Sequence, residues 1–147
     1  MKPLALITGV GPGTGASVAR RFAAAGYRTA LLARNENRLN ELASELPDSN
    51  AFVCDVTDSE ALAQVVEAAG PVDVVVHNAV GGGWGTFSEI EPAMLENNFQ
   101  VNVMALLHLA RLTTPSMVQA GKGALIVTGN TSALRGRAPF AGFAPTK

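Results

Sequence analysis

Short apolar runs alternate with segments of helical periodicity along this 147-residue sequence, and that alternation restricts the fold more than any other feature. Strands joined by helices in this way need right-handed crossovers, which give a parallel sheet with helices on both faces. The chain contains no repeat or linker, so residues 1–147 are expected to form a single α/β domain. The expected strands are 4–8, 27–33, 51–54, 72–79 and 124–129, and the expected helices are 16–26, 35–46, 58–70 and 92–121.

Local signals place the ends of these helices. Gly26 and Gly70 are expected to end the first and third helices, and Pro47 prevents the second from continuing. Asp58 or Ser59 is expected to cap the third helix. The long helix 92–121 is expected to bend near Pro115.

Composition excludes several classes of partner. A formal net charge of −1 leaves no basic surface for nucleic acid or an anionic membrane. No apolar run reaches the roughly 20 residues that span a bilayer, and the first apolar stretch is too short for a signal peptide. Cys54 is the only cysteine and is expected to fill the core, while His77 and His108 lack companion ligands for a metal and are expected to be structural. We therefore expect a soluble cytoplasmic protein without a metal site.

The stretch "TGVGPGTG" (8–15) lies between a buried strand and a helix. Glycines at this place let the backbone turn tightly and approach a pyrophosphate, which the free N–H groups of the helix start can bind. A glycine-rich turn without a ligand is the alternative. Because the stretch follows the first strand, we favour phosphate binding.

The spacing Thr-Gly-x-x-x-Gly-x-Gly resembles the short-chain dehydrogenase/reductase family, and the resemblance continues along the whole chain. "CDVTD" (54–58) is similar to the Asp-Val-Thr that follows the third strand in the family. "VDVVVHNAV" (72–80) is similar to its Asn-Asn-Ala-Gly segment, with His77 and Val80 departing from it. "FQVNVMALLHLAR" (99–111) and "GALIVTGNTSALRG" (123–136) resemble the helix with the family's Asn and the strand before its catalytic Ser. The resemblance implies a Rossmann-type, three-layer α/β/α fold with strand order 3-2-1-4-5.

The resemblance also implies a set of dinucleotide contacts. Asp55 would contact adenine, although it could instead cap the next helix. Trp84 would lie near the substrate, or it could simply pack its loop. The expected cofactor-binding residues are Thr8, Gly9, Gly11, Gly13, Thr14, Gly15, Arg34, Asn35, Asp55, Val56, Asn78, Ala79 and Lys147.

The residues after the second strand bear on the choice of cofactor. An Asp or Glu there would bind a ribose 2′-hydroxyl, whereas a 2′-phosphate needs a cation. The chain has Ala33, Arg34 and Asn35 in this place, and a guanidinium suits a phosphate. NADP(H) is therefore favoured over NAD(H), although Pro12 stands in a loop where the family's NADP enzymes often have a basic residue.

The catalytic residues depart from the family pattern. Lys147 matches the Lys of Tyr-x-x-x-Lys, so Phe143 stands at the Tyr position, and Asn130 stands at the Ser position. Phenylalanine has no proton to give, and this excludes the family's usual proton transfer. Asn102 would remain from the catalytic set, although it could be a surface helix residue, and water, Thr131 or Ser132 would have to deliver the proton.

Three functions therefore stay open. The chain could be part of an NADP(H)-dependent oxidoreductase that transfers hydride between nicotinamide and a carbonyl or alcohol of unknown identity. It could be a catalytically inactive NADP(H)-binding protein or assembly partner, or a purely structural subunit. Family members are longer, so we expect a fragment with an exposed fifth strand, and a homo-oligomer (dimer or tetramer) in the full-length form.

Overall fold

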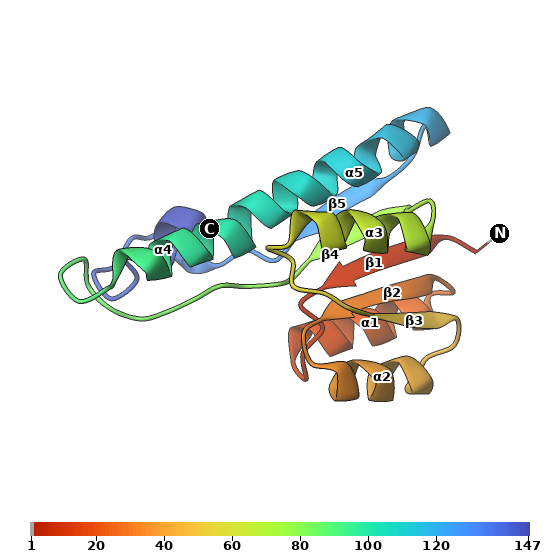
Figure 1. Ribbon diagram of the computed structural model, residues 1–147, viewed down its shortest axis with the longest axis horizontal. Coiled ribbons are helices and arrows are strands. Elements are labelled where there is room, and N and C mark those ends of the chain that lie inside the picture. Colours follow the sequence, from red (N-terminus) through yellow and green to blue (C-terminus); the bar gives the residue numbers. More distant parts are fainter. Residues whose placement is uncertain (1) are drawn as a thin grey trace.

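The sheet of this protein has five parallel strands in the order β3-β2-β1-β4-β5 (Figure 1). The computed structural model describes residues 2–147. Both the fold class and the strand order that the sequence predicts are confirmed. The strands are β1 (Leu4–Thr8), β2 (Arg28–Ala33), β3 (Ser49–Val53), β4 (Val74–His77) and β5 (Ala124–Val127).

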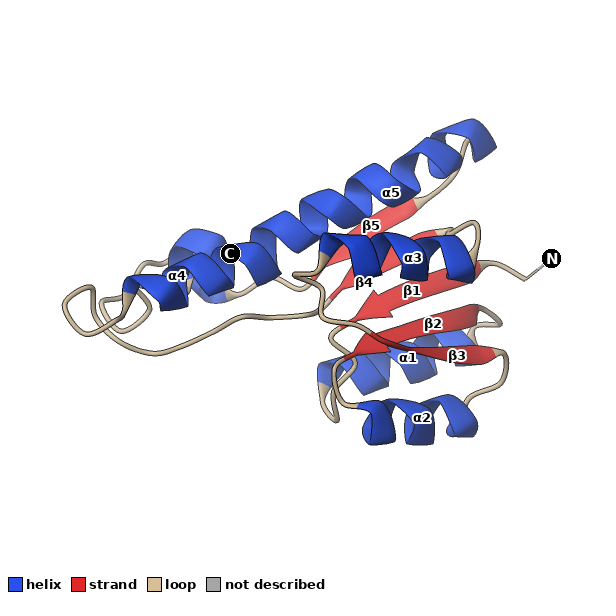
Figure 2. Cartoon of the chain, in the orientation of Figure 1, coloured by secondary structure: helices blue, strands red, loops and turns tan. Residues whose placement is uncertain are grey.

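Helices cover both faces of the sheet (Figure 2). One face packs against α1 and α2 through residues such as Ile7, Ala19 and Leu39. The other packs against α3 and α5 through residues such as Leu6 and Leu109. β1 is buried along its whole length because successive side chains enter the two cores alternately. The helical elements are α1 (Thr14–Ala24), α2 (Glu36–Glu45), α3 (Ser59–Ala69), α4 (Pro92–Phe99), the π-helix η1 (Gln100–Met104), α5 (Ala105–Ala120), and the 3₁₀ turns η2 (Thr131–Ala133) and η3 (Ala144–Thr146).

Strands β4 and β5 are at least two residues shorter than expected, and helix α1 begins earlier. β4 ends at His77 rather than at 79, because Asn78 Nδ2 there donates to the carbonyl of Gly9 and the N–H of Ala79 donates to Thr8 Oγ1. β5 ends at Val127 rather than at 129. α1 begins at residue 14 instead of 16. The end of β4 therefore turns toward the glycine-rich loop instead of extending the sheet.

The long helical region departs from α-helical geometry at the π-helix η1, which the sequence did not predict. Pro115, the expected site of a bend, lies within α5. The hydroxyls of Thr113 and Thr114 donate to the carbonyls of Leu109 and Ala110 in the preceding turn. A π-helix leaves the local backbone hydrogen bonding irregular, and such segments often lie at functional sites.

Strand β5 is an exposed edge, as expected. It pairs with β4 on one side, and all four of its residues are exposed. Leu125, Ile126 and Val127 are 39 to 45% exposed although they are apolar. The segment that follows β5 lies beside α4 (Figure 1).

Candidate active site

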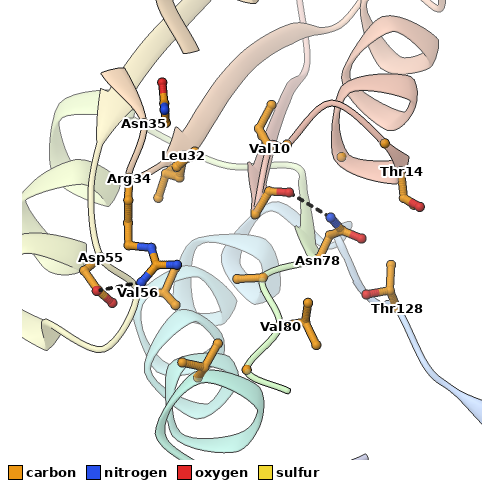
Figure 3. Close-up of a pocket in the computed structure, with 18 of the residues that line it drawn as sticks. Val10, Thr14, Leu32, Arg34, Asn35, Asp55, Val56, Asn78, Val80 and Thr128 are labelled. Atoms are coloured by element: carbon orange, nitrogen blue, oxygen red, sulfur yellow. Dashed lines mark hydrogen bonds and ion pairs between the residues drawn. The ribbon is translucent and has the colours of Figure 1, made fainter. Parts of the chain in front are cut away.

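A cavity of about 940 Å³ opens at the carboxyl ends of the strands (Figure 3). Ligands of open α/β sheets bind at this edge, where the strand order reverses between β1 and β4. Thr8 is fully buried and does not line the cavity. Every other cofactor-binding residue that the sequence predicts does line it: Gly9, Gly11, Gly13, Thr14, Gly15, Arg34, Asn35, Asp55, Val56, Asn78, Ala79 and Lys147.

The glycines of the loop between β1 and α1 fall into two kinds. Gly9 has a φ of +68°, and a Cβ there would overlap the backbone of Ala79. A Cβ at Gly15 would overlap the carbonyl oxygen of Gly9. A Cβ at Gly11 or Gly13 would meet nothing within 4 Å. Gly9 and Gly15 thus let the loop pack closely, while Gly11 and Gly13 leave the backbone open to the cavity.

The amino terminus of α1 lacks a side-chain cap. Asn35 caps α2 by accepting from the N–H of Arg38, and Asp58 caps α3 by accepting from two backbone N–H groups. At the corresponding place in α1 stands Gly13, which has no side chain to accept a hydrogen bond. The first N–H groups of α1 and the positive end of its dipole therefore meet the cavity, which suits an anion such as a pyrophosphate.

Two hydrogen bonds made by the buried residue His77 connect this loop to η1. The ring of His77 lies 2.9 Å from Thr8 Oγ1 and 2.9 Å from the carbonyl oxygen of Val101. A carbonyl only accepts, so His77 Nε2 carries the proton and Nδ1 accepts from the Thr8 hydroxyl. Burial lowers the pKa of His77. His77 therefore has the structural role that we expected. Thr8 is buried beneath the loop and supports it from the side away from the cavity.

The side of the cavity formed by the residues after β2 and β3 carries two guanidinium groups. Arg34 is exposed, and its Nη1 lies 3.9 Å from Asp55 Oδ2 (Figure 3). The N–H of Thr57 donates to Asp55 and is the main cause of that carboxyl's lowered pKa. The cap of α3 is Asp58, so Asp55 does not take the alternative role of a helix cap.

Arg38 also lines the cavity, and the sequence reasoning missed it. The signal was available: Arg38 lies four residues after Arg34, in the first turn of a predicted helix. Asn35 lines the cavity as well, but its side-chain oxygen is engaged by the Arg38 N–H.

Three residues from the expected catalytic region line the other end of the cavity: Asn130, Phe143 and Lys147. Lys147 Nζ lies 5.6 Å from the centroid of the Phe143 ring and donates to the carbonyl of Thr128 at 3.4 Å. Burial lowers the pKa of Lys147. Asn130 Oδ1 accepts from the N–H of Ser132, which leaves the Asn130 amide N–H groups available as donors.

Asn102 is buried and does not line the cavity. Its Oδ1 accepts from the N–H of Gly81, and its Nδ2 donates to the carbonyl of Gly81 and to Thr146 Oγ1. It thereby ties η1 to the residue before Lys147. Asn98 has a similar role, donating to the carbonyl of Gly142, and was not singled out in the sequence. Its position four residues before Asn102 was the available signal.

Thr131 and Ser132 are not brought to this cavity. They line a second cavity, of about 430 Å³. Trp84 packs against Phe140, with ring centroids 4.6 Å apart, while its loop pairs with residues 139–141. The expected packing role of Trp84 is therefore present, although the residue remains 74% exposed.

Two kinds of feature are absent from residues 2–147. No helix among them is long and apolar enough to cross a membrane. No three of their His, Cys, Asp or Glu side chains gather in a way that could hold a metal ion. Cys54 is buried in the core, as expected, and burial raises the pKa of its thiol.

Comparison with known proteins identifies close structural and sequence relatives. L-xylulose reductase of Bos taurus is 30% identical over 129 residues, which are 88% of this chain and 53% of the relative. D-erythrulose reductase of Gallus gallus is 31% identical over 144 residues, 97% of this chain and 58% of the relative. This chain therefore spans little more than half the length of these curated relatives.

Solved structures agree with these relatives. A metagenomic short-chain oxidoreductase in complex with NADP superposes with a TM-score of 0.90 at 30% identity, over 99% of this chain and 70% of the other. A 7α-hydroxysteroid dehydrogenase complexed with NADH superposes with a TM-score of 0.93 at 28% identity, over 98% and 59%. The family model described as short chain dehydrogenase matches residues 3–147. This chain belongs to the short-chain dehydrogenase family of oxidoreductases.

Proposed function

We propose that this protein, in its active form, transfers hydride between NADP(H) and a carbonyl or alcohol substrate. One observation carries the proposal: a single cavity has an uncapped helix terminus at one end and Lys147 at the other. The named relatives L-xylulose reductase and D-erythrulose reductase are reductases of carbonyl compounds by name, which supports the reaction class.

The donor set of the cavity fits NADP(H). Gly11 and Gly13 leave room for a pyrophosphate beside the start of α1. Arg34 and Arg38 supply two guanidinium groups for a 2′-phosphate, and Asp55 is already engaged by Thr57 and Arg34. When bound, the dinucleotide would supply the hydride for reduction. Solved relatives contain NADP or NADH, so the preference for NADP(H) rests on these two arginines.

Asn130 and Lys147 take the polar roles in the reaction. The Asn130 amide N–H would donate to the substrate's carbonyl oxygen and stabilise negative charge that develops there. The Lys147 ammonium, whose pKa burial lowers, would pass a proton to that oxygen and recover one from water. Asn102 positions Lys147 through Thr146. Thr131 and Ser132, which line the other cavity, have no part in this proton transfer.

Two measurements test this function. Calorimetry with NADPH and NADH should show tighter binding of NADPH. NADPH oxidation with a panel of sugars, oxo esters and oxo acids should show turnover that Lys147→Met abolishes and Arg21→Gln, an exposed change outside the cavity, leaves intact. Turnover should fall as pH rises through the lowered pKa of Lys147, because only the ammonium form donates. Turnover unaffected by Lys147→Met would disprove the proton role, and absence of dinucleotide binding would disprove the function itself.

A catalytically inactive NADP(H)-binding protein is the second candidate. Phe143 favours it, because this side chain supplies no proton and lies under the Lys147 ammonium. This alternative expects NADPH binding without turnover of any substrate. Phe143→Tyr would separate the two candidates: a gain in kcat from a measurable baseline supports the active enzyme, and detectable hydride transfer by the unaltered protein excludes the inactive one.

We also propose that the protein forms homo-oligomers through the α4–α5 region. Apolar side chains remain exposed there, including Phe99, Leu107 and Leu112. Sedimentation equilibrium of the protein and of a Leu107→Glu variant tests this, since a charge at a subunit contact should shift the mass toward the monomer.

A further inference from the structure

The residues of a second cavity directly follow, in the sequence, a residue that lines the candidate active site. Asn130 lines the first cavity, and the next residues, Thr131 and Ser132, line the second. The proposed hydride and proton transfer uses none of the residues of this second cavity. Its other lining residues are Leu134, Arg135, Arg137 and Phe140.

The hydroxyl of Ser132 is buried in this cavity wall without a hydrogen-bond partner. Ser132 is 6% exposed, and its Oγ has no partner among the residues that the structure describes. Its backbone N–H is held by Asn130 Oδ1, so the residue is fixed in place. A buried hydroxyl without a partner is costly. The Oγ atom itself has almost no accessible surface, so a ligand oxygen can accept from it only after the adjoining cavity wall shifts, and that hydrogen bond would then remove the cost.

Two guanidinium groups border the same cavity. Neither Arg135 nor Arg137 takes part in the ion pairs found within residues 2–147. A guanidinium presents a planar fork of donors that matches the oxygens of a carboxylate or a phosphate. Both arginines are exposed and therefore accessible to a ligand from solvent.

Apart from Thr131, the remaining lining residues are apolar. Leu134 and Phe140 line the cavity, and Phe140 is supported from behind by the indole of Trp84. Cationic groups, a free hydroxyl and an apolar wall together suit a ligand that has an oxyanion on an apolar stem.

We propose that this cavity is a subsite for the oxyanion, a carboxylate or phosphate, of an amphipathic carbonyl substrate. Ser132 Oγ and the guanidiniums of Arg135 and Arg137 bind the oxyanion, and Leu134 and Phe140 contact the stem. The identity of the ligand as a carbonyl substrate rests on the proposed function. The binding of an oxyanion here does not.

Trp84 provides the test, because it is the only tryptophan of the sequence and contacts a cavity residue. The protein, without dinucleotide, is titrated with 3-phenylpropanoate, phenyl phosphate and methyl 3-phenylpropanoate while tryptophan fluorescence is recorded. We expect a saturable change with an anionic probe and none with the ester. The anion that binds more tightly decides between carboxylate and phosphate. Raising the salt concentration should weaken binding of the anion, since the arginines are exposed.

Variants identify the residues. Arg135→Gln and Arg137→Gln should each weaken binding of the anionic probe about tenfold, because each removes a charged hydrogen-bond partner. Ser132→Ala should weaken it severalfold. Arg21→Gln removes an equally exposed arginine on α1 and should change nothing. Far-ultraviolet circular dichroism establishes that each variant is folded.

Two results would overturn the subsite. One is equal binding of the ester and the acid, and the other is unchanged, salt-independent affinity in an Arg135→Gln/Arg137→Gln double variant. These results come from binding titrations and do not depend on turnover. They can therefore be interpreted even if the proposed function is wrong. Conversely, NADPH oxidation that is as efficient with oxo esters as with the matching oxo acids would retain the proposed function and contradict the subsite.

Discussion

The two ends of the large cavity differ in the groups that face a ligand: backbone groups at one end and side chains at the other. At the glycine-loop end, backbone groups face the ligand: Gly13 begins α1 without a cap, and a Cβ at Gly11 or Gly13 would meet only open space. At the other end, individual side chains face it, with Asn130 and Lys147 coming from separate short segments. The first end binds through groups that every residue has, and the second depends on particular residues.

This difference explains how such a site can keep binding an anion while its proton-transfer residues change. Substituting one side chain leaves backbone N–H groups in place, so anion binding tolerates change at many positions. Proton transfer depends on one side chain. A single substitution, such as Phe143 at the tyrosine position, therefore removes the usual proton donor. The fold is the same in either case, since Phe143 packs beside Gly82 and beneath Lys147.

The largest effect is expected at Gly15. A Cβ there would overlap the backbone of Gly9 and Val10, which cannot move without disturbing β1. Gly15→Ala should lower the free energy of unfolding by about 3 kcal/mol or more, measured by urea denaturation. Gly11→Ala is the matched control: its Cβ meets open space, so stability should change little while NADPH affinity falls. Equal losses of stability would refute the division of the glycines into two kinds.

Asn102 should be the next most sensitive position. Asn102→Leu leaves the N–H and carbonyl of Gly81 without their partner, and should cost about 2–4 kcal/mol in urea denaturation. Asn97→Leu makes the same change at an exposed asparagine five residues earlier and should cost under about 0.5 kcal/mol. Similar costs for both would show that the side-chain end is not held by this buried amide.

Arg34 and Arg38 line the side of the cavity that follows β2, where we expect their side chains to add to the binding by backbone groups. Replacing Arg34 or Arg38 by Gln should weaken NADPH binding about tenfold, the equivalent of one charged hydrogen bond, and leave NADH binding nearly unchanged. Calorimetry with both dinucleotides measures this. Arg21→Gln, at an exposed arginine of α1 outside the cavity, serves as control. A parallel loss for NADH would assign both arginines to general binding instead.

The smallest effect concerns His77 and pH. Burial lowers the pKa of this histidine below its ordinary value of 6.5, so the unfolded chain binds a proton that the folded chain does not. The free energy of unfolding should therefore fall as pH drops from about 7 toward the lowered pKa, by at most about 1.4 kcal/mol for each pH unit. The carboxyls with lowered pKa, such as Asp73, contribute only at more acidic pH. Denaturation between pH 5.5 and 7.5 measures the slope, and His77→Asn should remove it.

Patterns within single segments predicted most of the fold. The apolar runs and the helix stops locate the strands and helices, and the glycine spacing places the loop, because each depends on neighbouring residues. The π-helix, the hydrogen bonds of His77 and the second cavity around Ser132 depend on contacts between segments 20 or more residues apart, or on unusual backbone geometry. No local pattern carries such information. Resemblance predicted Lys147 and Asn130 at the cavity, but it also placed Thr131 and Ser132 with them, and the turn at η2 directs those two to a different wall.

The π-helix η1 contains, in effect, one residue more than a regular helix would need. Deleting a single residue between 100 and 104 would let α4 and α5 join as one uninterrupted helix. A π-turn takes up one extra residue while the α-helices on either side keep their faces, so α4 would hardly rotate relative to α5 after the deletion. Asn98 would keep its hydrogen bond to the carbonyl of Gly142, whereas the carbonyl of Val101, which accepts from His77, would return to regular i to i+4 hydrogen bonding. The extra residue of η1 therefore frees a backbone carbonyl to hold the histidine behind the glycine-rich loop, and its loss should loosen that loop while the sheet, α4 and α5 remain folded.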